Sequence, residues 1–108
     1  MGLFDIFRKK PKPRPTEGGE PTGVGYTGGG GGTMETAVVV HASSSMSGIP
    51  AVYAYVSAMH GERGRDWELE LQALMHADGR HFDVLKIKLA NGKQETYHFD
   101  ISEFFGKF

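Results

Sequence analysis

Residues 67–99, WELELQALMHADGRHFDVLKIKLANGKQETYHF, decide the fold of this 108-residue chain. Apolar and polar residues alternate through three runs, which Ala77-Asp78-Gly79 and Ala90-Asn91-Gly92 separate. Alternation is typical of strands with one buried face, and short turns closed by glycine are typical of hairpins. The stretch therefore predicts three consecutive antiparallel strands.

The length of the first turn determines which side chains share a face. A two-residue Asp78-Gly79 turn would set Leu71 opposite Lys86, whereas a three-residue loop sets Leu71 opposite Leu85. Only the longer loop keeps the apolar side chains on one face, so the alternation favours it. This alignment sets Leu69 opposite Ile87 and Trp67 opposite Leu89. A three-residue loop at Asn91-Gly92 likewise sets Leu85 opposite Tyr97, Val84 opposite His98 and Asp83 opposite Phe99. The predicted core face then consists of Trp67, Leu69, Leu71, Leu85, Ile87, Leu89, Tyr97 and Phe99.

The same alignment gives the opposite, outer face an apolar patch near the first turn. Contiguous apolar patches often mark interaction sites. The candidate partner-binding residues in this patch are Leu74, Phe82, Val84 and His98. Residues 101–108 contain three phenylalanines and are expected to form a short helical turn, and this segment could instead fold over the patch and cover it.

The preceding residues add a strand and a helix. Residues 37–41 are rich in valine and predict a strand, while apolar residues recur every three or four positions over residues 49–60 and predict a helix that ends at Gly61. A strand over residues 52–56 is the alternative. Residues 34–108 thus predict a two-layer α+β domain, with one helix packed on a mainly antiparallel four-stranded sheet in the order β-α-β-β-β and a short C-terminal helical turn.

Residues 1–33 differ from the rest of the chain in composition, since they hold ten of the 16 glycines and four of the 5 prolines. Proline favours extended chain, glycine adds chain entropy, and neither buries much apolar surface. Residues 9–33 are therefore predicted to be a disordered linker that precedes the domain. Residues 1–8 are interpreted as a separate apolar-basic peptide.

The predicted peptide has four apolar side chains directly before Arg8-Lys9-Lys10. They are Leu3, Phe4, Ile6 and Phe7. Such a sequence can lie at an anionic membrane surface. The first ten residues, and only these, resemble the N-terminal membrane-targeting peptide of the bacterial division-site specificity factor MinE, which implies weak contact with a membrane surface. The alternative is a docking peptide for a groove in a protein.

The serines before the predicted helix form a candidate anion site, because unpaired N–H groups point outward at a helix N-terminus. They are Ser43, Ser44, Ser45 and Ser47. With His41 nearby, they support an alternative function as a small anion- or nucleotide-binding domain or an enzyme. The stretch contains no phosphate-binding fingerprint and no Gly-x-Ser-x-Gly motif, and serine is also a common helix cap, so we predict no catalytic residue.

Charge and composition restrict the remaining classes. The chain has no cysteine, which excludes disulfides and thiolate metal sites, and its five histidines do not converge, so we predict no metal site and no cofactor. The order of a helix, three strands and a terminal helix resembles double-stranded-RNA-binding folds, and the basic arm could contact phosphates. However, residues 34–108 are acidic, which disfavours nucleic-acid binding. With no apparent signal peptide or membrane span, the sequence predicts a cytoplasmic protein.

The favoured functional hypothesis is a non-enzymatic protein-interaction module. A flexible linker would tether it to an N-terminal peptide that docks on an unidentified protein partner or a membrane surface. Formation of a homodimer through the outer face or the edge strands is one version of this hypothesis.

Overall fold

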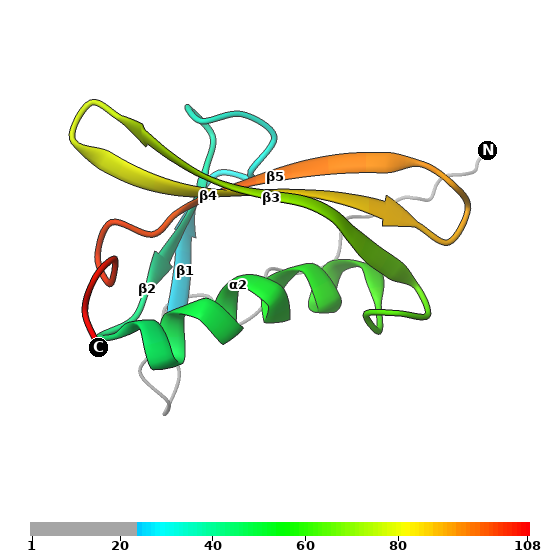
Figure 1. Ribbon diagram of the computed structural model, residues 1–108, viewed down its shortest axis with the longest axis horizontal. Helices are drawn as coiled ribbons and strands as arrows, with labels where there is room; N and C mark the ends of the chain where they lie inside the picture. The colour runs from blue at the N-terminus through cyan, green and yellow to red at the C-terminus, as the bar shows by residue number, and fades with distance from the viewer. Residues whose placement is uncertain (1–23) are drawn as a thin grey trace.

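The computed structural model describes residues 24–108. The predicted apolar-basic peptide, with Leu3, Phe4, Ile6 and Phe7, lies outside the described residues, as does most of the predicted linker. The domain is α+β, with the helix along one face of a sheet (Figure 1), as the sequence predicts.

The sheet has five strands, one more than predicted. In chain order the elements are β1 (Gly25–Gly28), β2 (Val38–His41), α2 (Ser45–His60), β3 (Trp67–Ala77), β4 (Arg80–Leu89) and β5 (Gln94–Asp100). The strands lie side by side in the order β1-β2-β5-β4-β3. Neighbouring strands are antiparallel except β2 and β5, which are parallel, so the sheet is mixed but mainly antiparallel.

Strand β1 lies within the range predicted to be linker. Its glycines argue against a strand, but Tyr26 anchors it. The Tyr26 side chain is buried, its hydroxyl donates a hydrogen bond to the Ala51 carbonyl in α2 over 2.7 Å, and its ring packs edge-on against Tyr55. One tyrosine in a glycine-rich stretch is too weak a local signal to predict a strand, since its partners are distant in sequence.

Helix α2 contains the predicted residues 49–60 but begins four residues earlier, at Ser45. Its apolar side chains Val52, Tyr55 and Val56 are buried against the sheet. The alternative of a strand over residues 52–56 is therefore wrong. Pro50 lies in the second turn of the helix, as counted from Ser45.

The pairing of β3 with β4 departs from the prediction at its midpoint. Leu69 lies opposite Ile87 and Trp67 opposite Leu89, as predicted, but Leu71 lies opposite Lys86. The predicted pairing of Leu71 with Leu85 is wrong.

A β-bulge at Glu70 allows the two halves of this hairpin to pair in different registers. The loop at its tip has two residues, Asp78 and Gly79, with φ of 52° and 75°. Two residues with positive φ give a turn whose twist matches that of the strands, and Asp-Gly is one of its preferred sequences. The extra residue in edge strand β3 then restores apolar pairing toward Trp67.

Beyond Glu70, the bulge reverses the face of the sheet on which each β3 side chain lies. Gln72 pairs with the core residue Leu85, and Leu74 pairs with Asp83, so Gln72 and Leu74 lie on the core side of the sheet. Leu71 moves to the outer face, where it is 59% exposed, although the sequence placed it in the core. By contrast, the pairing of β4 with β5 follows the prediction, with Leu85 opposite Tyr97.

The C-terminal segment packs against the first turns of α2. Backbone N–H groups of Phe104 and Phe105 donate to the Ile101 carbonyl and form the short turn that the sequence predicts. Phe104 is buried, and a Cβ atom added at Gly48 would lie 2.5 Å from its ring. The close approach of the segment to the helix therefore requires glycine at position 48.

We predict that Gly48→Ala lowers the free energy of unfolding by about 1–3 kcal/mol, because the added methyl overpacks the contact with Phe104. At an open helical site the same change would raise stability. The matched variant Ala54→Gly, at an exposed position of α2, measures that propensity effect and should cost roughly 0.5–1 kcal/mol. Urea unfolding measures both. A Gly48→Ala chain at least as stable as the parent would contradict the packing described.

Candidate functional site

The four residues predicted to form an outer-face patch do not form one open surface. Val84 and His98 pair across β4 and β5 as predicted, but Phe82 is only 2% exposed. Leu74 is exposed on the opposite, core side of the sheet because of the bulge. The predicted grouping of these four side chains is therefore wrong.

Other parts of the chain cover the outer face near Phe82 and His98. The Arg80 guanidinium lies 5.2 Å from the centre of the Phe82 ring. The loop between β1 and β2 lies on the side of the sheet away from α2 (Figure 1), and its Gly31 carbonyl accepts hydrogen bonds from the backbone N–H of His98 over 2.7 Å and from His98 Nδ1 over 2.9 Å. The C-terminal segment, the cover considered from sequence, instead packs beside α2.

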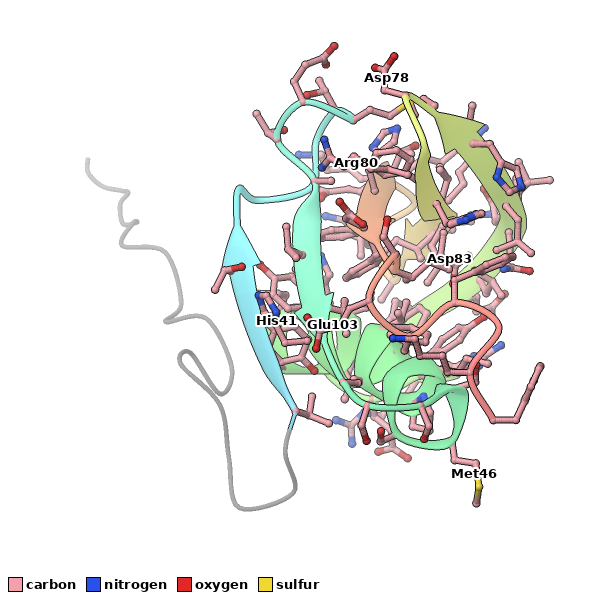
Figure 2. The ribbon with its side chains drawn as sticks, turned by 90° about the vertical axis from the view of Figure 1, so that its left-hand side faces the viewer. His41, Met46, Asp78, Arg80, Asp83 and Glu103 are labelled. Atoms are coloured by element: carbon pink, nitrogen blue, oxygen red, sulfur yellow. The ribbon has the colours of Figure 1, made fainter. Side chains whose placement is uncertain are left out.

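A groove on the core side of the sheet replaces the outer face as the candidate site. We call it the Asp83 groove; its volume is about 410 Å³. It lies between the first turns of α2, the projecting half of the β3–β4 hairpin and the C-terminal segment. Its lining residues are Ser45, Ile49, Tyr53, Gln72, Leu74, Asp83, Ile101, Phe105, Gly106 and Phe108. Figure 2 shows Asp83 beside the C-terminal segment and α2.

The walls of the Asp83 groove are apolar and accessible. Three large side chains from three different elements are largely exposed, namely Ile49 at 51%, Leu74 at 56% and Phe108 at 96%. Removal of such side chains from water by a ligand favours binding, by roughly 1.5–3 kcal/mol for each side chain that is completely buried. The groove is therefore suited to hold apolar groups.

Asp83 adds a buried negative charge to these apolar walls. The residue is 5% exposed, and its Oδ1 accepts a hydrogen bond from Gln72 Nε2 over 2.6 Å. Burial raises the pKa of Asp83, and the hydrogen bond from Gln72 opposes this shift only in part. No Lys, Arg or His within residues 24–108 forms an ion pair with Asp83.

Asp83 also acts on the neighbouring Tyr53. The pKa of the Tyr53 hydroxyl is raised first by burial and then by the negative charge of Asp83. The Arg63 guanidinium lies 5.0 Å from the centre of the Tyr53 ring and has the opposite effect on this pKa. The phenol is thus neutral near pH 7, and it can donate or accept a hydrogen bond in the groove.

The other buried carboxylate, Asp100, shows how this chain satisfies a structural acid. Its Oδ2 accepts a hydrogen bond from Arg80 Nη2 over 2.6 Å, and its Oδ1 accepts one from the Ser102 hydroxyl over 2.6 Å. Burial acts to raise the pKa of Asp100, but the bonds from Ser102 and Arg80 together outweigh burial and lower it. Asp83 is buried without a comparable set of donors, which distinguishes it as a candidate ligand-binding group.

The predicted serine site is partly occupied by the chain itself. The Ser45 N–H donates to the Lys107 carbonyl over 2.6 Å, and the Ser47 hydroxyl donates to the Ser44 carbonyl over 3.3 Å. Ser44 is the N-cap but forms no side-chain capping bond, and Ser43 is exposed. The proposed anion site at these serines stays a prediction, while Ser45 itself lines the Asp83 groove.

His41 contacts a threonine and a glutamate rather than the serines. Its Nε2 lies 2.6 Å from Thr27 Oγ1, and its Nδ1 lies 2.9 Å from Glu103 Oε1; Figure 2 shows His41 next to Glu103. These contacts link β1 and β2 to the C-terminal turn. None of the three residues lines the Asp83 groove.

The remaining histidines do not form a metal site. Within residues 24–108, no group of three or more His, Asp or Glu side chains could hold a metal ion. His76 and His81 lie opposite each other on one face of the sheet because of the bulge. The His81 ring stacks on Phe105 with centroids 4.0 Å apart, so this histidine helps to position the C-terminal wall of the groove.

A second cavity, of about 170 Å³, lies at the other end of the β3–β4 hairpin. Charged side chains of Arg65, Glu68 and Lys88 surround it. Glu68 lies opposite Lys88 in the sheet, and Arg65 contacts Asp66, so these charges are balanced locally. This cavity offers fewer recognition features than the Asp83 groove.

Comparison with known proteins adds no family. No protein-family model matches the chain, and neither the curated proteins nor the solved structures include a detectable relative. In the part of the chain that the structure describes, no helix has the length and apolar character needed to cross a membrane.

We predict that Asp100→Asn lowers the free energy of unfolding at pH 7 by about 1.5–3 kcal/mol, because it weakens buried bonds to a charged acceptor. A lowered pKa means that ionised Asp100 stabilises the fold above the unfolded-state pKa of about 3.9 and loses this effect as the pH falls through the folded-state pKa. The deficit of the variant should therefore shrink between pH 5 and pH 2.

Chemical denaturation across this pH range measures the difference. Asp78→Asn provides the matched control, because Asp78 is exposed in the two-residue turn and asparagine also tolerates positive φ. An Asp100→Asn deficit that is constant with pH would show that the carboxylate charge is not the source of the stabilisation.

Proposed function

We propose that this chain is a non-enzymatic protein-interaction module, and that the Asp83 groove binds a protein segment with apolar side chains beside a Lys or Arg. One observation carries the proposal: a carboxylate that is 5% exposed and has no cationic partner among the described residues lies in a groove with exposed apolar walls. The interaction function that the sequence suggests is thus assigned to the core side of the sheet instead of the outer face.

The buried charge favours a basic ligand. An unpaired buried carboxylate costs free energy, and a ligand that brings a guanidinium or ammonium group recovers part of this cost through charge-assisted hydrogen bonds. A ligand without a cation would leave Asp83 desolvated and unpaired. Asp83 therefore contributes specificity, while Leu74, Ile49 and Phe108 contribute apolar contact area.

The shape of the site favours a peptide segment. The lining comes from a helix, a hairpin and a terminal segment, and the exposed side chains Ile49, Leu74 and Phe108 each project from a different one of them. A volume of about 410 Å³ is within the usual range for ligand pockets and holds a few side chains. Grooves with separated apolar contact points are common in peptide recognition.

A peptide-selection experiment tests this function. A phage-displayed random peptide library is panned on the full chain carrying L3S, F4S, I6S and F7S, so that the chain's own apolar segment cannot compete. We expect enrichment of peptides with apolar residues next to Lys or Arg. The Leu74→Asp variant should lose this enrichment, and Asp83→Asn should retain apolar selection but lose the preference for basic residues.

The chain provides a matched control for this experiment. Leu71 is as exposed as Leu74 and lies three residues away on the same strand, but it faces the opposite side of the sheet. Leu71→Asp should leave the selection unchanged. Circular dichroism spectra must show that each variant is folded. The absence of enriched peptides, or enrichment that Leu71→Asp and Leu74→Asp reduce equally, would refute groove-dependent binding.

A further inference from the structure

We propose that the Asp83 groove is occupied by the chain's own N-terminal segment, residues 3–10, in an intramolecular contact. This inference rests on the proposed function, because it names the peptide that the groove binds. The segment itself lies outside the described residues, and residues 11–23 join it to the domain.

The chemistry of the segment matches that of the groove. Residues 3–7 supply two aliphatic and two aromatic side chains, and Arg8, Lys9 and Lys10 follow directly. The groove supplies exposed Ile49, Leu74 and Phe108 and the buried carboxylate of Asp83. The apolar side chains can cover the walls while one of the three cations pairs with Asp83, which meets both requirements for a ligand.

Overall charge supports the same contact. The chain has 12 Lys and Arg residues and 13 Asp and Glu residues. Five of the basic and three of the acidic residues lie in residues 1–33, which leaves seven and ten for residues 34–108. The N-terminal part is therefore net positive and the domain net negative, and the two attract each other.

The connecting chain is long enough. Gly25, at the start of β1, pairs with His41, and His41 precedes the groove residue Ser45 by four positions. Ser45 is therefore at most about 14 Å along the chain from His41, at about 3.5 Å per residue. Residues 11–23 can span about 40 Å even in the polyproline conformation that their prolines favour. The segment can thus reach the groove with slack remaining.

Tethering makes the intramolecular contact competitive with other ligands. A short tether gives an effective concentration on the order of millimolar, so even a weakly binding segment would occupy the groove for much of the time. The same apolar side chains cannot contact the groove and a membrane surface at once. Occupancy of the groove would therefore withhold the segment from other surfaces until a stronger ligand displaced it.

Paramagnetic relaxation in the full chain tests the contact. Because the sequence has no cysteine, Lys12→Cys introduces a single nitroxide site just outside the segment. We expect loss of the NMR signals of groove residues Ile49 and Leu74, and retention of the signal of Gly92, in the turn at the far end of strand β4 from the groove. The signals should return in the chain that also carries L3S, F4S, I6S and F7S. Asp83→Asn should restore them in part.

A mixing experiment shows whether the segment that contacts the groove belongs to the same chain or to a second copy. Isotope-labelled chain without nitroxide is mixed with unlabelled chain that carries the nitroxide. The intramolecular contact predicts no signal loss in the mixture, whereas loss there would show that a second copy supplies the segment and would overturn the proposal.

The remaining outcomes separate this inference from the function on which it rests. If groove signals are retained in the nitroxide-labelled chain while phage selection depends on Leu74, the groove binds another protein and the self-contact is wrong. If groove signals are retained and the segment instead makes the chain sediment with anionic phospholipid vesicles, a membrane explains the segment. If groove signals are retained and phage selection also fails to depend on Leu74, the proposed function fails as well.

Discussion

The bulge at Glu70 is the constraint on which the rest of the structure depends. The Asp78-Gly79 turn imposes one register on the tip of the β3–β4 hairpin, while the apolar pairs around Trp67 require another. One extra residue in an edge strand satisfies both. Its effect reaches the candidate site, because the exchange of faces places Gln72 and Leu74 on the same side of the sheet as Asp83. If the register of the pairs around Trp67 extended through the whole hairpin without a bulge, Leu74 would lie opposite Phe82 on the outer face, and the groove would lose one of its apolar walls.

Sequence patterns predict the parts of this fold that arise from local or neighbouring residues. The helix, the last three strands and the alignment of β4 with β5 follow from apolar periodicity and from turn chemistry. The alternation in β3 favoured the wrong turn because it was assumed to be continuous, and a bulge interrupts it. Strand β1 was missed because its stability depends on Tyr26 and a helix carbonyl 25 residues away. Such tertiary contacts override local propensity.

The candidate site likewise contains one residue that the sequence pattern could indicate and several that it could not. Asp83 had a visible signal, since the predicted register already placed this charged residue opposite Phe99 on the core face, and the structure keeps that pair. A carboxylate in an apolar layer indicates either a structural partner or a ligand. Ile49, Tyr53 and Phe108 could not be assigned to the site from sequence, because the groove exists only where the helix start, the hairpin and the C-terminal segment meet. In the predicted outer-face patch, only Leu74 was placed by the incorrect half of the register, while Phe82 and Val84 do lie on the outer face, where Phe82 is buried.

The contact of Phe104 with Gly48 has a consequence for how the groove is built. The Phe104 ring packs on Gly48, and the Ser45 N–H donates a hydrogen bond to the Lys107 carbonyl. These two contacts hold the C-terminal wall of the groove against the first turn of α2, which lies about 60 positions earlier in the chain. The width of the groove is thus fixed by long-range closure of the fold and not by any local element. Neither the isolated hairpin nor the isolated helix would form this groove, so the groove exists only once the whole domain has folded.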